Sequence, residues 1–275
     1  MEDPVPARIA LGLEYDGSAF FGWQRQPDCT TVQGTLEHAL AEIAGEAIPV
    51  HAAGRTDRGV HATGQVVHFD TAVKRPLSAW VRGVNRHLPR SVAVLWASPV
   101  EGDFHARFSA SGRHYRYLLL DHRVRPALAH GRVGWHHGEL DLQAMCAAAT
   151  CLVGTHDFSS FRAAECQADS PVRELRVASV SRSAGLIEFR FSANGFLHHM
   201  VRNLVGALIA VGSGRRSTGW LAEALHARDR NAAAPTFAPD GLYLCGVDYP
   251  ERFGLPGFDH HAALPQPGTD TPPCT

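Results

Sequence analysis

The sequence predicts an α+β fold made of two halves that share one order of elements. Two observations lead to this prediction. Before Val100, stretches that alternate apolar and polar residues, typical of strands, are interleaved with two stretches of helical periodicity. After Val100 the same order starts again. The order β-α-β-β-α-β is the ferredoxin-like pattern, which forms an antiparallel sheet with helices on one face. We expect the two sheets to join into one extended sheet with a central cleft, where ligands often bind.

The first half contains four expected strands and two expected helices. Its strands are predicted at 8–16, 49–53, 64–69 and 91–100, and its helices at 31–45 and 77–88. Thr30 or Thr31 can cap the first helix and Gly45 can end it, because a hydroxyl satisfies free amides and glycine adopts the left-handed conformation. Pro76 and Pro89 bracket the second helix.

The second half repeats this order with an insertion at 122–140. Strands are predicted at 112–121, 174–183, 186–192 and 241–249, and helices at 141–152, 196–211 and 218–227. The pair Ala184-Gly185 predicts the turn of a hairpin. The halves share no visible sequence identity, so the repeat is one of architecture. We therefore predict a first half at 1–105, a second half at 106–252, and a mostly disordered tail at 253–275, which is rich in Pro, Gly and Thr.

Length and composition indicate a cytoplasmic globular protein. The chain has 275 residues, of which 45% are hydrophobic, enough for one large core or two small ones. No apolar run is long enough to cross a membrane, and the N-terminus lacks the features of a signal peptide. The six cysteines include no CxxC pair, which favours reduced thiols and argues against a zinc site.

Charge is unevenly distributed although the net charge is only −1. Between residues 105 and 132 the only acid is Asp121, whereas bases are numerous: Arg107, Arg113, Arg116, Arg123, Arg125, Arg132, His105, His114, His122 and His130. The preference for arginine over lysine favours a phosphate-binding surface, because the guanidinium fork matches phosphate oxygens. A solvated basic face is the alternative.

The stretch AAGRTDRGVHATGQVVHFDT, residues 52–71, contains the first candidate for chemistry. Asp57 lies between Gly54 and Gly59, and three potential cations stand close in sequence: Arg55, Arg58 and His61. A single carboxylate on a glycine-bounded loop beside cations suits a nucleophile. Since Asp and Gly are also the commonest turn residues, an ordinary turn explains the same pattern.

The predicted strand at 112–121 offers a second candidate. Alternation places Arg113, Tyr115 and Tyr117 on one face, and His114 and Arg116 on the other. A strand that presents Arg and Tyr together can stack a base and hold a phosphate. The alternative is an edge strand with amphipathic side chains.

Arg202 is the third candidate, because it interrupts an otherwise apolar predicted helix. Burying a guanidinium costs several kcal/mol unless a partner is supplied, so we expect an acid partner, and Asp57 is a natural one. The alternative places Arg202 on the solvent side. His198 and His199 would point about 100° apart on this helix, which argues against a metal pair and favours structural or RNA-facing roles. We interpret the stretch 227–249 as a connection followed by a core strand.

Seven stretches, taken together and in this order, resemble one family, the TruA-type tRNA pseudouridine synthases. They are YDGSAFFGWQRQP, TVQGTLEHAL, AAGRTDRGVHATGQVVHF, FHARFSASGRHYRY, GTHDFSSFRA, NGFLHHMVRNLVGAL and DGLYLCGVDYP. GRTDRGVHA is the most specific of them. The resemblance extends from Ala7 to about Tyr249, and only the tail lies outside it.

The resemblance implies an activity, partners and site residues. The family isomerises uridine to pseudouridine at positions 38, 39 and 40 of the tRNA anticodon arm, needs no cofactor and no metal, and binds tRNA as a homodimer. Asp57 matches the catalytic aspartate, Tyr115 the tyrosine that stacks on the target base, and Arg202 the arginine that pairs with the aspartate. The sequence leaves open whether Asp57 attacks the base, attacks the ribose or removes a sugar proton. We expect these side chains to bind RNA: Arg55, Arg58, His61, Arg107, Arg113, Arg116, Arg123 and Arg125.

Two other classes of protein compete with this hypothesis. A nucleoside or glycoside hydrolase would usually need two positioned carboxylates, and no second acid is near Asp57 in the sequence. A non-catalytic RNA-binding module would keep the basic strand but would not require Asp57 or a partner for Arg202.

Overall fold

The computed structural model describes residues 6–257, which form two compact units. Unit 1 contains residues 6–113 and 243–257, and unit 2 contains residues 114–242. Each unit combines helices with mostly antiparallel strands, so the predicted α+β class is confirmed. None of the described helices is both long and apolar enough to cross a membrane.

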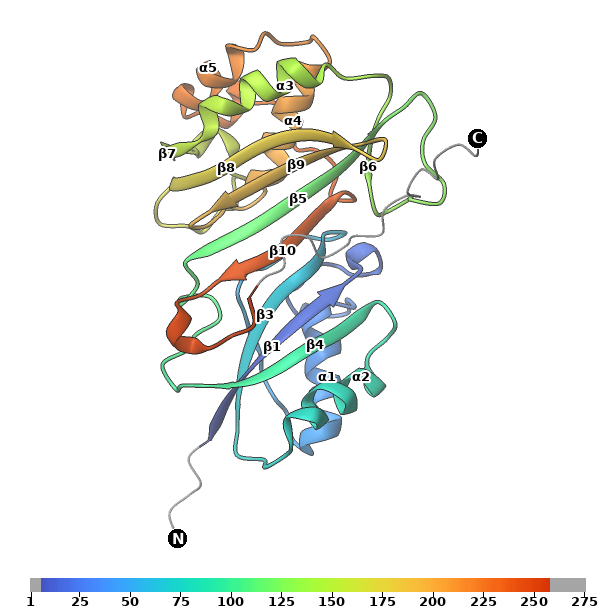
Figure 1. Ribbon diagram of the computed structural model, residues 1–275, viewed down its shortest axis with the longest axis vertical. Helices are drawn as coiled ribbons and strands as arrows, with labels where there is room; N and C mark the ends of the chain where they lie inside the picture. Colours follow the sequence, from blue (N-terminus) through green and yellow to red (C-terminus); the bar gives the residue numbers. More distant parts are fainter. Residues whose placement is uncertain (1–5, 258–275) are drawn as a thin grey trace, which may run out of the picture. The chain divides into compact units, whose positions relative to one another are not determined.

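Unit 1 is built around the long strand β3 (Figure 1). Its strands are β1 (Ala7–Tyr15), β2 (His51–Ala52), β3 (His61–Thr71), β4 (Val92–Val100) and most of β10 (Leu242–Asp248). β1 lies between β4 and β3 and is antiparallel to both. Because β2 has only two residues, it pairs with β3 only around His68, and β10 runs parallel to β3 around His61. The strand order β4-β1-β3-β2 fits the ferredoxin-like pattern.

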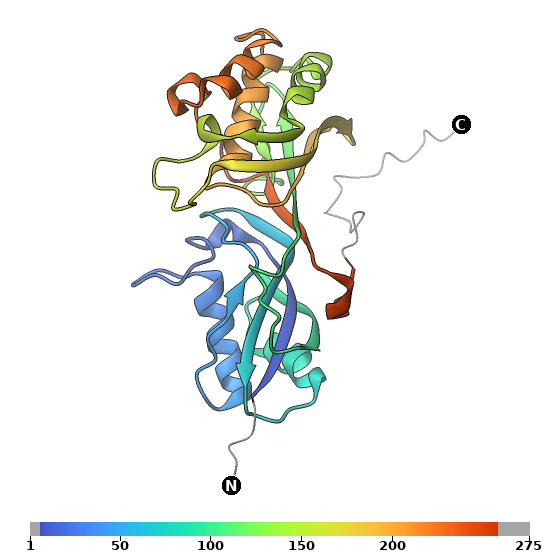
Figure 2. The ribbon, with the colours of Figure 1, turned by 90° about the vertical axis from the view of Figure 1, so that its left-hand side faces the viewer.

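The helices of unit 1 pack against one face of its strands (Figure 2). Helix α1 (Val32–Ala44) has the predicted caps: the Thr31 hydroxyl accepts a hydrogen bond from the Gly34 amide, and Gly45 adopts a φ of 80°. The second predicted helix is instead a π-helical turn, Ala79–Gly83, followed by α2 (Val84–His87). Trp80 lies in that turn and is fully buried. Tertiary packing therefore accompanies the wider π-helical backbone, and the spacing of residues in the sequence does not reveal such packing.

Unit 2 has strands in the order β5-β9-β8-β7. They are β5 (Gly112–Asp121), β7 (Gly154–Asp157), β8 (Val172–Ser183) and β9 (Leu186–Ala193), with β6 (Gly134–His136) parallel to β5. The predicted bounds of β5 are confirmed. The hairpin turn is also confirmed, with φ of 49° at Ala184 and 76° at Gly185. β6 and β7 were not predicted, since strands of three and four residues give little alternation.

Helices α3 (Leu142–Ala149), α4 (Met200–Gly212) and α5 (Trp220–Ala227) lie on one face of the unit 2 strands (Figure 2). Every residue of α4 is buried except Arg202. α4 contacts α3 and α5 and therefore forms the centre of this core. The predicted helix at 196–211 was wrong at its start, because His199 takes a left-handed φ of 61° and the helix begins only at Met200.

The structure departs from the sequence prediction near the C-terminus as well. The last strand, β10, packs in unit 1, where a Cβ on Gly64 would lie 2.1 Å from the Cys245 carbonyl oxygen. The tail predicted to be disordered begins with an ordered residue, because Phe253 is buried and its ring lies 5.0 Å from that of Phe104. Residues 258–275 lie outside the described part of the chain.

Candidate active site

Asp57 lies on the loop between β2 and β3 of unit 1. The Val60 amide donates to the Asp57 carbonyl at 3.1 Å, and Gly59 takes a φ of 80°, so residues 57–60 form a tight turn. The turn interpretation is therefore correct for the backbone. It does not exclude the catalytic one, because the Asp57 side chain is only half-buried.

Hydrogen bonds from β1, β3 and the segment after β1 hold this loop in place. The Thr56 hydroxyl lies 2.8 Å from the Tyr15 hydroxyl, and the Thr56 carbonyl accepts from the Trp23 amide at 3.0 Å. The Gln65 side-chain amide donates to the Gly54 carbonyl at 2.7 Å. Burial raises the pKa of Tyr15 to about 12, so its hydroxyl stays neutral at pH 7 and can serve this network.

Two glycines let neighbouring backbone approach the loop closely. Gly22 has a φ of 89°, and a Cβ there would lie 2.9 Å from the Thr56 carbonyl oxygen and 3.2 Å from the Asp57 carbonyl carbon. At Gly17 a Cβ would lie 2.0 Å from the Val60 carbonyl oxygen. Any larger residue would displace the Asp57 turn, because both contacts are with backbone atoms.

The predicted cations of unit 1 occupy different environments. Arg55 and Arg58 are exposed, and the Arg58 guanidinium lies 4.3 Å from the centre of the Phe21 ring. His61 is 1% exposed, and its Nδ1 accepts from the Gly17 amide at 3.0 Å. His61 therefore supports the fold and presents no surface to an RNA, which argues against the predicted contact.

The Arg113 guanidinium is bonded to backbone carbonyls within the protein. Its Nη2 donates to the carbonyls of Ala53 at 3.2 Å and Arg107 at 2.6 Å, and its Nη1 donates to Ala110 at 3.3 Å. These bonds tie the start of the Asp57 loop to the turn before β5. Arg107 itself is exposed.

Two tyrosines on β5, Tyr115 and Tyr117, lie in different environments. The Tyr115 ring is half-buried and meets the Phe196 ring edge to face, with centroids 4.9 Å apart. The Tyr117 hydroxyl is buried and donates to the Ala238 carbonyl at 3.0 Å. Burial, with the nearby Asp240 charge, raises the pKa of Tyr117.

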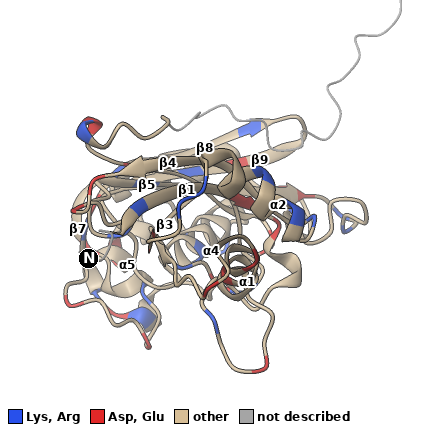
Figure 3. Cartoon of the chain, turned by 90° about the horizontal axis from the view of Figure 1, so that it is seen from below, with Lys and Arg blue, Asp and Glu red and all other residues tan. Residues whose placement is uncertain are grey.

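Arg116 forms an ion pair with Glu188, which is 6% exposed and also accepts from Arg190 at 2.7 Å. Burial alone would raise the pKa of Glu188, but the hydrogen bonds from Arg190 and Arg116 outweigh it and lower the pKa. Arg116 is therefore engaged within the protein. Arg123 and Arg125 are exposed, and basic residues elsewhere are interspersed with acids (Figure 3).

Arg202 is anchored to a loop that follows α5. Its Nε donates to the Phe237 carbonyl at 2.9 Å, and the Phe237 amide donates to the Arg202 carbonyl at 3.3 Å. The Arg202 guanidinium therefore has a hydrogen-bond partner within unit 2, and this partner is a backbone carbonyl. The predicted partner, Asp57, belongs to unit 1.

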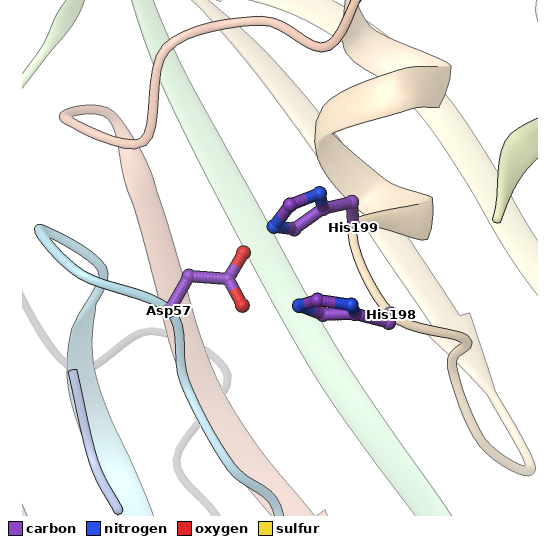
Figure 4. Close-up of side chains that lie close together, drawn as sticks. All are labelled: Asp57, His198 and His199. Carbon is purple, nitrogen blue, oxygen red and sulfur yellow. The ribbon is translucent and has the colours of Figure 1, made fainter. Parts of the chain in front are cut away.

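His198 and His199 do not lie on α4, contrary to prediction. They occupy the turn that leads into it, as Figure 4 shows. Their ring centroids lie 4.0 Å apart. Helical spacing does not set the directions of these two side chains, because the left-handed His199 turns the backbone before the helix starts.

Sequence reasoning missed Asn203, which follows Arg202. It is 0% exposed, its Nδ2 donates to the Phe161 carbonyl at 2.7 Å, and its Oδ1 accepts from the Thr236 hydroxyl at 2.6 Å. The signal was present, since an amide inside an apolar helix must find hydrogen-bond partners. The stretch 227–249 is therefore more than a connection, because it supplies one of them.

The chain matches one family of known proteins. A family model described as tRNA pseudouridine synthase matches residues 13–109 and 148–250, which include Asp57 and Arg202. The tRNA pseudouridine synthase A of Thiobacillus denitrificans is 60% identical over 249 residues, covering 90% of this chain and 96% of the relative. That of Chromobacterium violaceum is 60% identical over 258 residues, covering 94% and 98%.

Among solved structures, one chain of an archaeal box H/ACA sRNP Nop10–Cbf5 complex aligns with a TM-score of 0.35 and 12% identity, over 84% of this chain and 61% of that one. This likeness is too distant to support an argument. The family model and the curated relatives are decisive, because each covers most of the chain. The chain belongs to the family of tRNA pseudouridine synthases, which are isomerases.

Proposed function

We propose that this chain converts uridine to pseudouridine at positions 38, 39 and 40 in the anticodon arm of tRNA. The observation that carries the proposal is the family match, which spans both units and includes the Asp57 loop and the Arg202 helix. The relatives are named tRNA pseudouridine synthase A, and the motif GRTDRGVHA around Asp57 is intact. The three positions come from the resemblance of these motifs to the TruA type.

The reaction is an isomerisation, so its atoms balance without a second substrate. The N1–C1′ bond breaks, the uracil turns, a C5–C1′ bond forms, and the proton on C5 leaves while N1 gains one. No electrons are exchanged with another molecule, so the proposed reaction needs no redox cofactor. The target base must leave its stack first, which costs a few kcal/mol that the pocket has to offset.

Asp57 is the catalytic carboxylate in this proposal. Its turn is fixed by the Thr56 and Gln65 hydrogen bonds and by the backbone contact at Gly22, while its side chain stays half-exposed. A carboxylate on a rigid support can assist the charge that develops as the glycosidic bond breaks. It must be ionised to do so.

Arg202 is the cation that pairs with this carboxylate in the proposal. A guanidinium has donors on three nitrogens. The Arg202 Nε donates to the Phe237 carbonyl, and we assign Nη1 and Nη2 to Asp57. An opposite charge at contact distance favours the negatively charged form that the reaction uses.

Tyr115 supplies the stacking surface for the everted uracil. Its ring is half-buried, and the edge-to-face contact with Phe196 fixes its plane. Stacking of a base on an aromatic side chain contributes about 1–3 kcal/mol, which matches the cost of unstacking.

The tRNA-binding surface in this proposal uses the exposed arginines: Arg55, Arg58, Arg107, Arg123 and Arg125. Arg113, Arg116 and His61 are left out, because their side chains are engaged or buried within the protein. We further propose a cytoplasmic homodimer that binds tRNA across both subunits without a metal. Sedimentation of the chain with and without tRNA tests the dimer, and activity in the presence of a chelator tests the metal.

The test of the proposed function maps pseudouridine in tRNA transcripts that carry uridine at only one of positions 38, 39 and 40. We expect conversion at each position and none in a matched transcript with cytidine at all three. Conversion confined to other positions would contradict the proposal. Release of free uracil would support a hydrolase instead, and binding without conversion would support an RNA-binding module.

A further inference from the structure

We infer that Asn203, Thr236 and Arg230 act as a clamp that positions the Arg202 guanidinium for the reaction. We call these three side chains the Asn203 clamp. The inference rests on the proposed function, because it gives the clamp a purpose only if Arg202 serves catalysis. It adds three positioning residues to the site, and none of them is expected to touch the tRNA.

The clamp is a closed set of hydrogen bonds between side chains. The Thr236 hydroxyl donates to Asn203 Oδ1 at 2.6 Å. Arg230 Nη2 reaches both of these groups, at 3.2 Å from Asn203 Oδ1 and 3.3 Å from the Thr236 hydroxyl. Arg230 Nη1 donates to the Ala234 carbonyl at 2.9 Å. Each member therefore contacts the other two, and Arg230 also fixes the backbone between them.

The other end of Asn203 ties the clamp to a second loop. Its Nδ2 donates to the Phe161 carbonyl at 2.7 Å, and the residue has no exposed surface. The amide is thus bonded on both sides, and its orientation is fixed. Arg230 is half-buried, and its guanidinium bonds to Ala234, Asn203 and Thr236, so this arginine serves the fold of the loop rather than a phosphate.

Sequence adjacency connects the clamp to Arg202. Asn203 directly follows Arg202 on α4, and Thr236 directly precedes Phe237 on the loop. The bond between Thr236 and Asn203 therefore holds the Phe237 carbonyl at the position where Arg202 Nε donates to it at 2.9 Å. The Phe237 amide closes the pair by donating to the Arg202 carbonyl at 3.3 Å.

Neighbouring backbone contacts limit where this loop can move. A Cβ on Gly206, one helical turn after Arg202, would lie 2.4 Å from the Pro235 carbonyl oxygen. On the far side of Phe237, the Ala238 carbonyl accepts from the Tyr117 hydroxyl at 3.0 Å. The Phe237 carbonyl is therefore held from both directions along the chain.

A flexible arginine needs such a support, because an unheld side chain spreads over many rotamers. The bond to a fixed carbonyl sets the plane of the guanidinium and hence the direction of Nη1 and Nη2. Catalysis depends on such placement, since an error of about 1 Å can lower a rate by about 10²-fold. Loss of the clamp should lower the rate of conversion more than it weakens tRNA binding.

The test removes the Thr236 hydroxyl with little change in shape. Thr236→Val should lower kcat for pseudouridine formation by about 10- to 100-fold, while the Kd for tRNA stays within about twofold of wild type. Thr236→Ser, which keeps the hydroxyl, should restore most of the rate. Thr218→Val, on an exposed threonine of the same unit, is the matched control and should leave kcat unchanged.

A double-mutant cycle separates positioning from general stability. Arg202→Lys keeps a charge but lacks the fork that can hold Phe237 and a carboxylate together. We expect Arg202→Lys to lower kcat, and Thr236→Val to have little further effect in the Arg202→Lys background. Additive losses, or a Thr236→Ser variant as slow as Thr236→Val, would overturn the clamp.

Two outcomes keep the clamp and the proposed function distinguishable. Wild-type kcat in Arg202→Lys would remove the role of Arg202 and with it the proposed site. A slow Arg202→Lys that shows no coupling to Thr236→Val would remove only the clamp. Should Thr236→Val fail to fold, Arg230→Met takes its place in the same cycle, where additive losses again count against the clamp.

Discussion

Asp57 and Arg202 are placed by two different kinds of support. Asp57 lies at a turn of a loop, and the contacts that hold it come from other segments: Tyr15 and Gln65 through hydrogen bonds, and Gly22 through close backbone approach. Arg202 lies on a helix whose other residues are all buried, and its own guanidinium is bonded to a carbonyl. The contacts around the loop fix the backbone at Asp57 and thereby its short side chain. The helix fixes the backbone at Arg202, but the long side chain needs its own bond to the Phe237 carbonyl.

The two supports share one feature, a glycine where backbone meets backbone. Gly22 lies against the Asp57 turn, and Gly206 lies against the loop that carries Phe237. In both places a side chain would displace carbonyl groups rather than flexible side-chain ends. Rigid placement of the two charges thus depends on close backbone packing in each unit.

The Arg202 support can be broken at Gly206. Alanine in a helix is favoured over glycine by about 1 kcal/mol, but a Cβ 2.4 Å from the Pro235 carbonyl oxygen should cost about 1–3 kcal/mol through overpacking. We expect Gly206→Ala to lower the melting temperature and to reduce kcat by at least about tenfold. Thermal unfolding and steady-state kinetics measure the two effects. Gly34→Ala on α1, where the nearest atom is the Thr31 hydroxyl at 3.2 Å, is the control. A variant as active as wild type would show that the loop can shift without moving the guanidinium.

The Asp57 support can be broken at Gly22. Gly22→Ala adds strain at a φ of 89° and a contact at 2.9 Å with the Thr56 carbonyl oxygen. Gly45 has nearly the same backbone, with a φ of 80°, but no atom within 4 Å of its missing Cβ. Both alanine variants should lose about 1 kcal/mol of stability, because the left-handed conformation is unfavourable for alanine. Only Gly22→Ala should lower kcat, by about tenfold. Equal kcat values in the two variants would contradict the proposed support.

A smaller effect concerns the stability of unit 1 at acid pH. His68 on β3 is 2% exposed, and its Nδ1 accepts from the Ala106 amide at 3.1 Å. Burial, followed by the charge of His105, lowers the pKa of His68 to about 4. The unfolded chain, with a pKa near 6.5, therefore binds more protons than the folded one between about pH 4 and pH 6.5.

The unfolding free energy should consequently fall as the pH drops from 6.5 toward 4, by at most about 1.4 kcal/mol per pH unit from this group. Urea unfolding at several pH values measures the slope. His68→Gln should show a shallower slope than wild type, whereas His38→Gln, on an exposed histidine of α1, should match wild type. An unchanged slope in His68→Gln would show that other groups cause the acid sensitivity.

Local pattern predicted most of the elements of both units. Alternation gave β5 from Gly112 to Asp121, and the hydroxyl of Thr31 with the freedom of Gly45 marked the ends of α1. The pairing of β10 with β3 was missed, because a contact between strands far apart in sequence leaves no trace in periodicity. The start of α4 was missed for a related reason: Phe196 and Leu197 continue the apolar pattern, but the backbone turns at His199.

The sequence predicted which residues form the candidate site better than it predicted the contacts that position them. Gly54 and Gly59 indicated a loop around Asp57, and the apolar surroundings of Arg202 indicated that its guanidinium needs a partner. The partner within unit 2 is a carbonyl, which every residue possesses, so no residue type could reveal it. Asn203 and Thr236 are bonded across 33 positions of sequence, and only the folded chain shows that they meet.

The most direct test of the account concerns Asp57 itself. Forming the C5–C1′ bond expels the hydrogen on C5, so tRNA labelled with tritium at C5 of uridine releases tritium as the reaction proceeds. In a single turnover with saturating enzyme, Asp57→Asn should bind this tRNA as tightly as wild type and release tritium at least about 10⁴-fold more slowly. Release at the wild-type rate by Asp57→Asn would contradict the assignment of this carboxylate to the reaction.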